Sequence, residues 1–310
     1  MMNSSRKIVI AFSLSLCLAF VACGGGGGSA GGIFEVEVEV NPPAPEFTYH
    51  VDATFGSDWN PGTELHPLRT ISAALLEALP GDSVKVAPGL YDSVHGESFP
   101  IQVPAGVTVI GGEDPASIEE TVIYGSGMTF VPGYAAAVQL YSSSSLTGFL
   151  VQNSVWTNGP TKQVGILVTG DDACIVDNVV FYNQFAGIYC DPNSENLWIL
   201  NNTVVGSREG MVFRNNTSAV VEGNVIQGNT IGLVIYKSDV NLGGAPGCNG
   251  GNLFTQNKQS DIHVVAGFLL VFAKNNYWDQ FPPVAGVNYF KPSSSNVLTD
   301  GAKHSGEYLF

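Results

Sequence analysis

Charged and aromatic side chains recur directly after four short apolar runs in the middle of the chain. Each run follows a glycine, and the fourth residues after these glycines are Thr169, Asp191, Arg214 and Tyr236. The positions that follow carry more polar side chains: Asp171, Asp172, Lys237 and Asp239. Grouped carboxylates suit a cation such as calcium or the hydroxyl groups of a sugar, whereas a guanidinium or ammonium group suits a carboxylate.

These positions support two hypotheses. In the first, carboxylates bind calcium or sugar hydroxyls: Asp171, Asp172, Asp191 and Asp239, of which the first three are the candidate calcium ligands. Tyr189 and Tyr236 complete the sugar site, and the candidate catalytic residues are Arg214, Lys237 and Asp172. In the second, Asp191 and Arg214 form an ion pair between neighbouring strands on a solvated turn.

The spacing of the glycines indicates which elements position these side chains. Gly165, Gly187, Gly210 and Gly232 lie 22, 23 and 22 residues apart, and every segment within this period is a short β-type run. Such a repeat without helices predicts a parallel β-helix with about 22 residues per coil and glycines at its turns. The first and third residues after each glycine are apolar, so we expect them to face the core and to stack from coil to coil.

Asparagines recur with the same period. One column contains Asn178, Asn202, Asn224, Asn252 and Asn276, and a second contains Asn153, Asn183, Asn229 and Asn257. Asparagine tolerates the left-handed backbone conformation, and stacked amides can form hydrogen bonds from coil to coil. We therefore predict a structural role for both columns.

An apolar stripe lies between the inward-facing positions. Alternation along the strands points Leu167, Tyr189, Val212 and Val234 outward. Two interpretations remain open: sugar rings stack on this stripe, or the C-terminal segment 282–310 folds back and covers it.

The N-terminus resembles a bacterial lipoprotein signal. Residues 1–22 begin with a basic region and continue with an apolar run that ends before Cys23. The segment from Phe20 to Gly24 resembles a lipobox, which implies lipidation of Cys23 and export to the cell envelope, at the outer membrane or cell surface. A glycine-rich and then proline-rich stretch, residues 23–46, predicts a tether and stalk.

The acidic composition of the chain argues against one functional class, the nucleic-acid-binding proteins. The 310 residues carry 12 basic and 27 acidic side chains, a net charge of −15, so the chain lacks the basic surface that nucleic acids require. With 45% hydrophobic residues the chain is long enough to bury a core. We expect contact with a membrane through the lipid anchor alone.

Residues 47–112 have a different pattern. An apolar stripe at helical spacing predicts a helix over 70–79, with Thr70 as N-cap and Pro80 and Gly81 at its end. This helix is expected to cap the first coil of the β-helix.

A family resemblance rests on the spacing of motifs in residues 48–112. These include Asp52, Gly56 and Asp58, then the Pro80–Asp82 turn, and the stretch from Gly96 to Pro100. The region resembles a domain of unknown function that precedes right-handed β-helices in bacterial and archaeal surface proteins. The following coils resemble the pectin-lyase-like superfamily, which implies an all-β right-handed parallel β-helix, export, and polysaccharide as the partner. The catalytic motifs of the β-helix polygalacturonases are missing, although Gly170, Asp171 and Asp172 are present.

We therefore expect a lipid-anchored β-helix protein that binds, or also processes, an extended polysaccharide along its solenoid. The alternatives are a uronate lyase or epimerase with calcium and an Arg or Lys base, and an adhesin or scaffold with a protein partner. The expected organisation is: signal 1–22, tether 23–46, cap 47–112, coils 113–281, and C-terminal tail 282–310.

Overall fold

The computed structural model describes residues 46–125, 133–153, 161–266, 270–291, 293 and 296–308. These residues belong to one compact unit, Pro43–Phe310. The predicted signal, the lipidation site Cys23 and nearly all of the tether lie outside the described residues. None of the described helices is long and apolar enough to span a bilayer.

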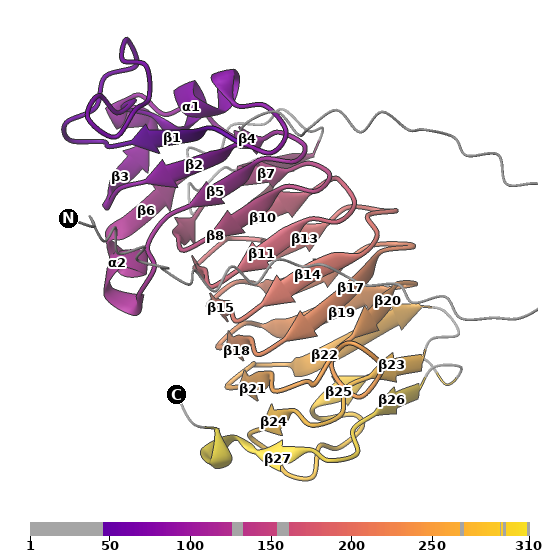
Figure 1. Ribbon diagram of the computed structural model, residues 1–310. Coiled ribbons are helices and arrows are strands. Elements are labelled where there is room, and N and C mark those ends of the chain that lie inside the picture. The colour runs from indigo at the N-terminus through magenta and orange to yellow at the C-terminus, as the bar shows by residue number, and fades with distance from the viewer. Residues whose placement is uncertain are drawn as a thin grey trace, which may run out of the picture. The chain divides into compact units, whose positions relative to one another are not determined.

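Three parallel sheets run the length of this unit, and the chain visits them in turn, which is the predicted right-handed parallel β-helix (Figure 1). The ten-stranded sheet consists of β1 (Thr48–Val51), β2 (Ser83–Val86), β5 (Thr108–Ile110), β8 (Ser145–Thr147), β11 (Cys174–Val176), β14 (Leu197–Leu200), β17 (Ser218–Glu222), β20 (Asp239–Asn241), β23 (Leu270–Phe272) and β26 (Asn296–Leu298). The eight-stranded sheet consists of β4 (Ile101–Val103), β7 (Tyr134–Leu140), β10 (Lys162–Val168), β13 (Ala186–Cys190), β16 (Glu209–Phe213), β19 (Ile231–Tyr236), β22 (Ser260–Ala266) and β25 (Tyr289–Phe290). The nine-stranded sheet consists of β3 (Gly89–Asp92), β6 (Thr121–Tyr124), β9 (Leu150–Gln152), β12 (Val179–Phe181), β15 (Thr203–Val205), β18 (Val225–Gln227), β21 (Leu253–Thr255), β24 (Tyr277–Trp278) and β27 (Lys303–His304).

The inward columns of the eight-stranded sheet are in the predicted register. Ile166 pairs with Ile188, which pairs with Met211, and Met211 pairs with Leu233. All four side chains are buried, as are their neighbours two residues further along each strand. The stacked apolar columns form the core that the repeat predicted.

Asparagine ladders join the coils from within, as predicted. In the first column the side-chain oxygen of Asn224 accepts the backbone N–H of Asn202 at 2.8 Å and its side-chain amide at 3.1 Å. Asn224 in turn donates in the same way to Asn252. In the second column Ser207 takes the place of an asparagine between Asn183 and Asn229.

The repeating glycines are not turn residues, which corrects the sequence prediction. Gly165, Gly187, Gly210 and Gly232 lie inside strands β10, β13, β16 and β19. A Cβ atom on Gly210 would lie 2.5 Å from the carbonyl oxygen of Gly232 and 3.0 Å from the side-chain nitrogen of Asn229. Glycine is required there because the strand passes close to the interior asparagine ladder.

The N-terminal end carries two α-helices and a 3-10 turn. Helix α1 (Ile71–Glu77) has Thr70 as its N-cap and ends two residues before the predicted Leu79, because Ala78 is extended. Helix α2 (Pro115–Glu120) precedes β6, and the 3-10 turn η1 (Ser93–His95) follows β3. A second 3-10 turn, η2 (Ser305–Glu307), lies at the C-terminal end.

Acidic residues of the N-terminal motifs accept hydrogen bonds from backbone N–H groups at the start of α1, which have no partner within the helix. The Asp58 carboxylate accepts the N–H groups of Arg69 and Thr70, and Glu97 accepts those of Ile71 and Ser72. Burial raises the pKa of Glu97. These carboxylates hold α1 in place, which accounts for their spacing in the sequence.

The described part of the C-terminal segment 282–310 extends the solenoid and does not cover the outward stripe of the eight-stranded sheet. Its strands β25, β26 and β27 pair with β22, β23 and β24, one in each sheet. The segment therefore supplies another coil, at the yellow end of the ribbon (Figure 1).

Candidate functional site

The outward side of the eight-stranded sheet gathers cationic and aromatic side chains. We call this set the cation–aromatic face; it lies on or beside strands β7, β10, β13, β16 and β19 and consists of Tyr134, Lys162, Phe185, Tyr189, Asp191, Arg208, Glu209, Arg214 and Tyr236. The face contains three residues of the predicted sugar site, Tyr189, Asp191 and Tyr236, and one candidate catalytic residue, Arg214. The other members were not identified from the sequence.

At the C-terminal ends of the strands, Arg214 stacks on an aromatic ring. Its guanidinium carbon lies 4.3 Å from the centroid of the Tyr236 ring, on the next strand. A cation–π contact of this kind holds a guanidinium over the face of a ring. The Nε atom of Arg214 is buried and has no hydrogen-bond partner among the described residues. The ring contact therefore positions the guanidinium.

The expected ion pair between Asp191 and Arg214 is absent from the described residues. Their ion pairs are Lys85–Glu113, His95–Asp92 and Lys274–Asp300. Burial raises the pKa of Asp191 above its usual value, and the positive charge of Arg214 only partly opposes this shift. The two residues occupy neighbouring coils as predicted. The backbone N–H of Arg214 donates to the carbonyl of Cys190, the residue before Asp191.

At the N-terminal ends of the strands, two cations share one ring. The Lys162 ammonium lies 4.7 Å and the Arg208 guanidinium 5.9 Å from the centroid of Phe185. Lys162 also lies 5.4 Å from the ring centroid of Tyr134. Both cations are exposed and Phe185 is half-buried. Lys162 and Phe185 precede Gly165 and Gly187 in the repeat, whereas the predicted site consists of residues that follow the glycines.

One carboxyl group lies among these cations. Glu209 is 9% exposed and its pKa is raised by burial, although Arg208, Lys162 and Arg214 act to lower it. The pairing of Glu209 with Ala186 and Ile231 places it in a column that is otherwise apolar. The carboxyl moderates the positive charge of the face.

The middle of the face is buried. Leu167, Tyr189, Val212 and Val234 point away from the core cluster as predicted, but each is only 1–2% exposed. The hydroxyl groups of Tyr189 and Tyr134 are 2.6 Å apart, and burial raises the pKa of Tyr189. The stripe is therefore not an open surface on which sugars can stack. A large ligand can contact the face at its two edges, where the cations lie.

The remaining site candidates lie apart from the face. The turns after β10, β13, β16 and β19 contain five, six, four and two residues, so positions beyond the first lose the register assumed from the repeat. Asp171 accepts the Glu195 N–H at 2.8 Å, and Asp172, in the left-handed conformation, pairs with the side chain of Asn196. Lys237 is exposed and left-handed. Asp239 begins β20 in the ten-stranded sheet.

The proposed calcium ligands are consequently not brought together. Across the described ranges, no three His, Cys, Asp or Glu side chains are grouped closely enough to hold a metal ion. Asp171 and Asp172 are exposed on their turn, whereas Asp191 is half-buried on the next coil.

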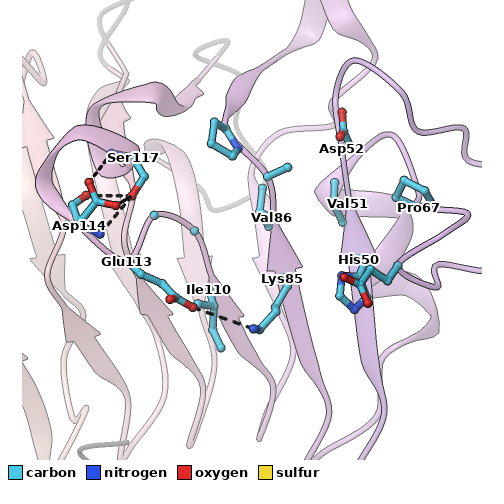
Figure 2. Close-up of a pocket in the computed structure, with 15 residues that line it drawn as sticks. His50, Val51, Asp52, Pro67, Lys85, Val86, Ile110, Glu113, Asp114 and Ser117 are labelled. Atoms are coloured by element: carbon cyan, nitrogen blue, oxygen red, sulfur yellow. Dashed lines mark hydrogen bonds and ion pairs between the residues drawn. The ribbon is translucent and has the colours of Figure 1, made fainter. Parts of the chain in front are cut away.

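A separate groove of about 460 Å³ lies near the N-terminal end, between β1, β2 and α2 (Figure 2). Most of its carboxylates already have partners. Asp52 accepts the N–H groups of Thr54 and Phe55, Asp114 caps α2, and Glu113 faces Lys85 at 3.9 Å. This groove has a structural explanation and lacks the ring-stacked cations of the cation–aromatic face.

The chain is similar to several solved structures at low sequence identity. ORF18 of Geobacillus virus E2 is 12% identical with a TM-score of 0.44, and the match covers 82% of this chain and 60% of that one. An alginate lyase from Paenibacillus sp. str. FPU-7 is 13% identical with a TM-score of 0.43, covering 83% and 99%. Pectate lyase Pel9A is 18% identical with a TM-score of 0.42, covering 82% and 58%. The chain thus spans about three fifths of the viral protein and of the pectate lyase.

No curated protein matches the sequence. The model of a family described as a protein of unknown function, DUF1565, matches residues 54–285. The match includes most of the N-terminal motifs and all coils of the cation–aromatic face. Because this match covers more than half of the sequence, the chain belongs to the DUF1565 family.

Proposed function

We propose that the protein binds a carboxylate-bearing polysaccharide along the cation–aromatic face. The observation that carries the proposal is the placement of three cations, each against an aromatic ring, on one side of one sheet. Two of the four arginines of the whole chain, Arg208 and Arg214, belong to this set.

The charge of the protein makes this concentration informative. With a net charge of −15, the surface repels polyanions in general, so binding of one requires a local positive region. Lys162, Arg208 and Arg214 supply such a region, which the carboxyl groups of Glu209 and Asp191 partly offset. Guanidinium groups match carboxylates geometrically through paired N–H donors.

The positions of the cations on the sheet indicate how a bound polymer would run relative to the strands. The cations lie on or next to β10 and β16, and neighbouring parallel strands are about 4.8 Å apart. A polymer that contacts both Lys162 and Arg208 must run along the solenoid axis and cross the strands. Aromatic rings at each edge, Phe185 and Tyr236, offer faces to the sugar rings.

The test is a calorimetric titration of the full chain with polygalacturonate and with the same polymer fully methyl-esterified. We expect binding of the first, weakening as salt rises, and none of the second, because esterification removes the negative charges that the cations would contact. Equal binding of both polymers, or of neither, would refute the proposal. Repeating the titration with calcium and with a chelator tests the calcium hypothesis separately.

Lyase or epimerase chemistry is the alternative, and one observation favours it. Asp191, a carboxyl whose pKa is raised by burial, lies beside a positioned guanidinium on the same face. Of the candidate catalytic residues, only Arg214 lies on the face. Cleavage by elimination would produce an unsaturated uronate, which the same mixtures would reveal as new ultraviolet absorbance. An adhesin with a protein partner would bind none of these polymers.

Lipid anchoring at Cys23 and location in the cell envelope are parts of the same proposal. Their support is the signal-like sequence of residues 1–22 and the lipobox-like segment that ends at Gly24. Mass spectrometry of the N-terminal peptide from membranes tests both, and an unmodified Cys23 would contradict the anchor.

A further inference from the structure

The most exposed large apolar side chains of the described residues are concentrated at one end of the molecule. Six of them are between 66% and 97% exposed, and all six lie in residues 55–94: Phe55, Trp59, Leu65, Leu76, Leu79 and Val94. Single exposed apolar residues are ordinary, but a group confined to one end of a solenoid calls for a partner.

Three of the six belong to one loop between β1 and α1. Trp59 is 97% exposed, and Phe55 and Leu65 flank it in the sequence. The other three lie on or beside α1 and η1, which pack at the same end (Figure 1).

The loop is fixed by hydrogen bonds on both sides of Trp59. The Asp58 carboxylate accepts the N–H groups of Arg69 and Thr70, each at 2.9 Å. The Asn60 side chain donates to the carbonyl of Pro67 at 2.8 Å, and its backbone N–H donates to Ser57. Trp59 is thus held out into solvent by a braced loop, which is the arrangement of an anchor side chain.

We propose that this loop inserts into the interfacial region of a lipid bilayer. Tryptophan and other large apolar side chains favour the membrane–water interface. The inference rests on the proposed lipidation of Cys23, which would hold the body close to a bilayer. The loop would then supply a membrane contact beyond the anchor, which was the one contact expected from the sequence, and would set which end of the solenoid meets the bilayer.

The place of the loop along the chain supports a membrane as the occupant. Cys23 lies 24 residues before Phe47, and 24 residues span at most about 85 Å, so the anchor restricts the body to the vicinity of the bilayer. The chain enters the body at β1, and the loop follows directly. The cap is therefore the end of the solenoid that is nearest to the anchor along the chain.

Charge selects the kind of lipid. The protein carries a net charge of −15, so an anionic surface repels it, whereas zwitterionic headgroups do not. The loop itself carries the exposed carboxylates Asp58 and Glu64 beside Trp59 and Leu65, which add to the repulsion from an anionic surface. These carboxylates would stay at the level of the zwitterionic headgroups while the apolar side chains enter the interface.

The experiment reconstitutes the full chain with vesicles of phosphatidylcholine whose acyl chains carry bromine, which quenches tryptophan fluorescence on contact. Trp59→Phe provides the reference that isolates the signal of Trp59. We expect wild-type protein to be quenched more than this variant, and the quenching to decrease when phosphatidylglycerol is added.

Two double variants test the loop itself. F55S/L65S keeps Trp59 as the reporter and removes its apolar neighbours, so we expect loss of the Trp59 quenching. F281S/V287S removes side chains that are 51% and 49% exposed on the C-terminal coil and should leave the quenching unchanged. The proposal is overturned if wild-type Trp59 is not quenched, if F55S/L65S is quenched as much as wild type, or if soluble polygalacturonate shifts Trp59 emission while vesicles do not.

Discussion

The interior asparagine ladders and the cation–aromatic face lie on the same coils but obey different rules. Inside, Asn202, Asn224 and Asn252 repeat the same hydrogen bonds in the same register. Outside, Lys162, Arg208 and Arg214 stand at different positions of the repeat and meet through ring contacts. The comparison teaches that periodic polar residues hold this fold together, whereas the residues proposed to bind a ligand depart from the period.

The largest expected effect is the loss of stability when an asparagine of the interior ladder is removed. Asn224→Ala removes donations to the carbonyls of Ile199 and Glu222 and breaks the ladder toward both neighbours. Because these partners are buried, we expect the free energy of unfolding to fall by about 3 kcal/mol or more in urea denaturation. Asn215→Ala, at an exposed turn position, is the control and should change stability by less than about 0.5 kcal/mol. Equal losses would contradict the structural role of the ladder.

A smaller loss is expected where the glycine column meets the ladder. Gly210→Ala places a Cβ 2.5 Å from the backbone oxygen of Gly232, so the strand must shift. Overpacking of this kind costs about 1–3 kcal/mol, measurable by the same denaturation. Gly306→Ala is the control, because its nearest atom is a His304 ring nitrogen at 3.2 Å on the C-terminal turn. A neutral Gly210→Ala would show that the glycines are not kept for close packing.

The smallest expected effect is that of Glu209→Gln on stability. The pKa of Glu209 is raised in the folded state by burial, so the folded protein binds more protons than the unfolded one between the two pKa values, and stability falls as pH rises through that window. We expect Glu209→Gln to be more stable than wild type at pH 7, with the difference vanishing below about pH 4. The same variant should bind polygalacturonate more tightly, since it removes a negative charge from the face. Weaker binding would indicate that Glu209 contacts the ligand directly.

The fold was largely predictable because its determinants repeat. The glycine period, the apolar columns such as Ile166 and Ile188, and the asparagine columns all predicted the β-helix, and the helix at 71–77 was recognisable from its apolar spacing and Thr70. The glycines were assigned to turns because a sequence does not show how closely a strand passes an interior side chain.

The site was only partly predictable. Tyr189, Asp191, Arg214 and Tyr236 lie at or before the first residue after each strand, where register is still set by the sheet. Asp171 and Asp172 lie beyond that point on a five-residue turn. Lys237 directly follows β19, but the turn there has two residues, so Asp239 already begins β20 and the register assumed from the repeat is lost. Phe185 was overlooked because its role depends on two cations from different coils that share its ring.

The central claim, that ring-stacked cations bind a polyanion, is tested most directly by two matched lysine and arginine variants. Arg214→Ala removes a cation from the face, whereas Lys303→Ala removes the cation that lies 5.1 Å from the Tyr277 ring on the nine-stranded sheet. The measurement is the dissociation constant for polygalacturonate at low salt. We predict a loss of about tenfold or more for Arg214→Ala and no change for Lys303→Ala, since one desolvated carboxylate contact is worth about 1.4 kcal/mol or more. Equal affinities of both variants and wild type would contradict the account.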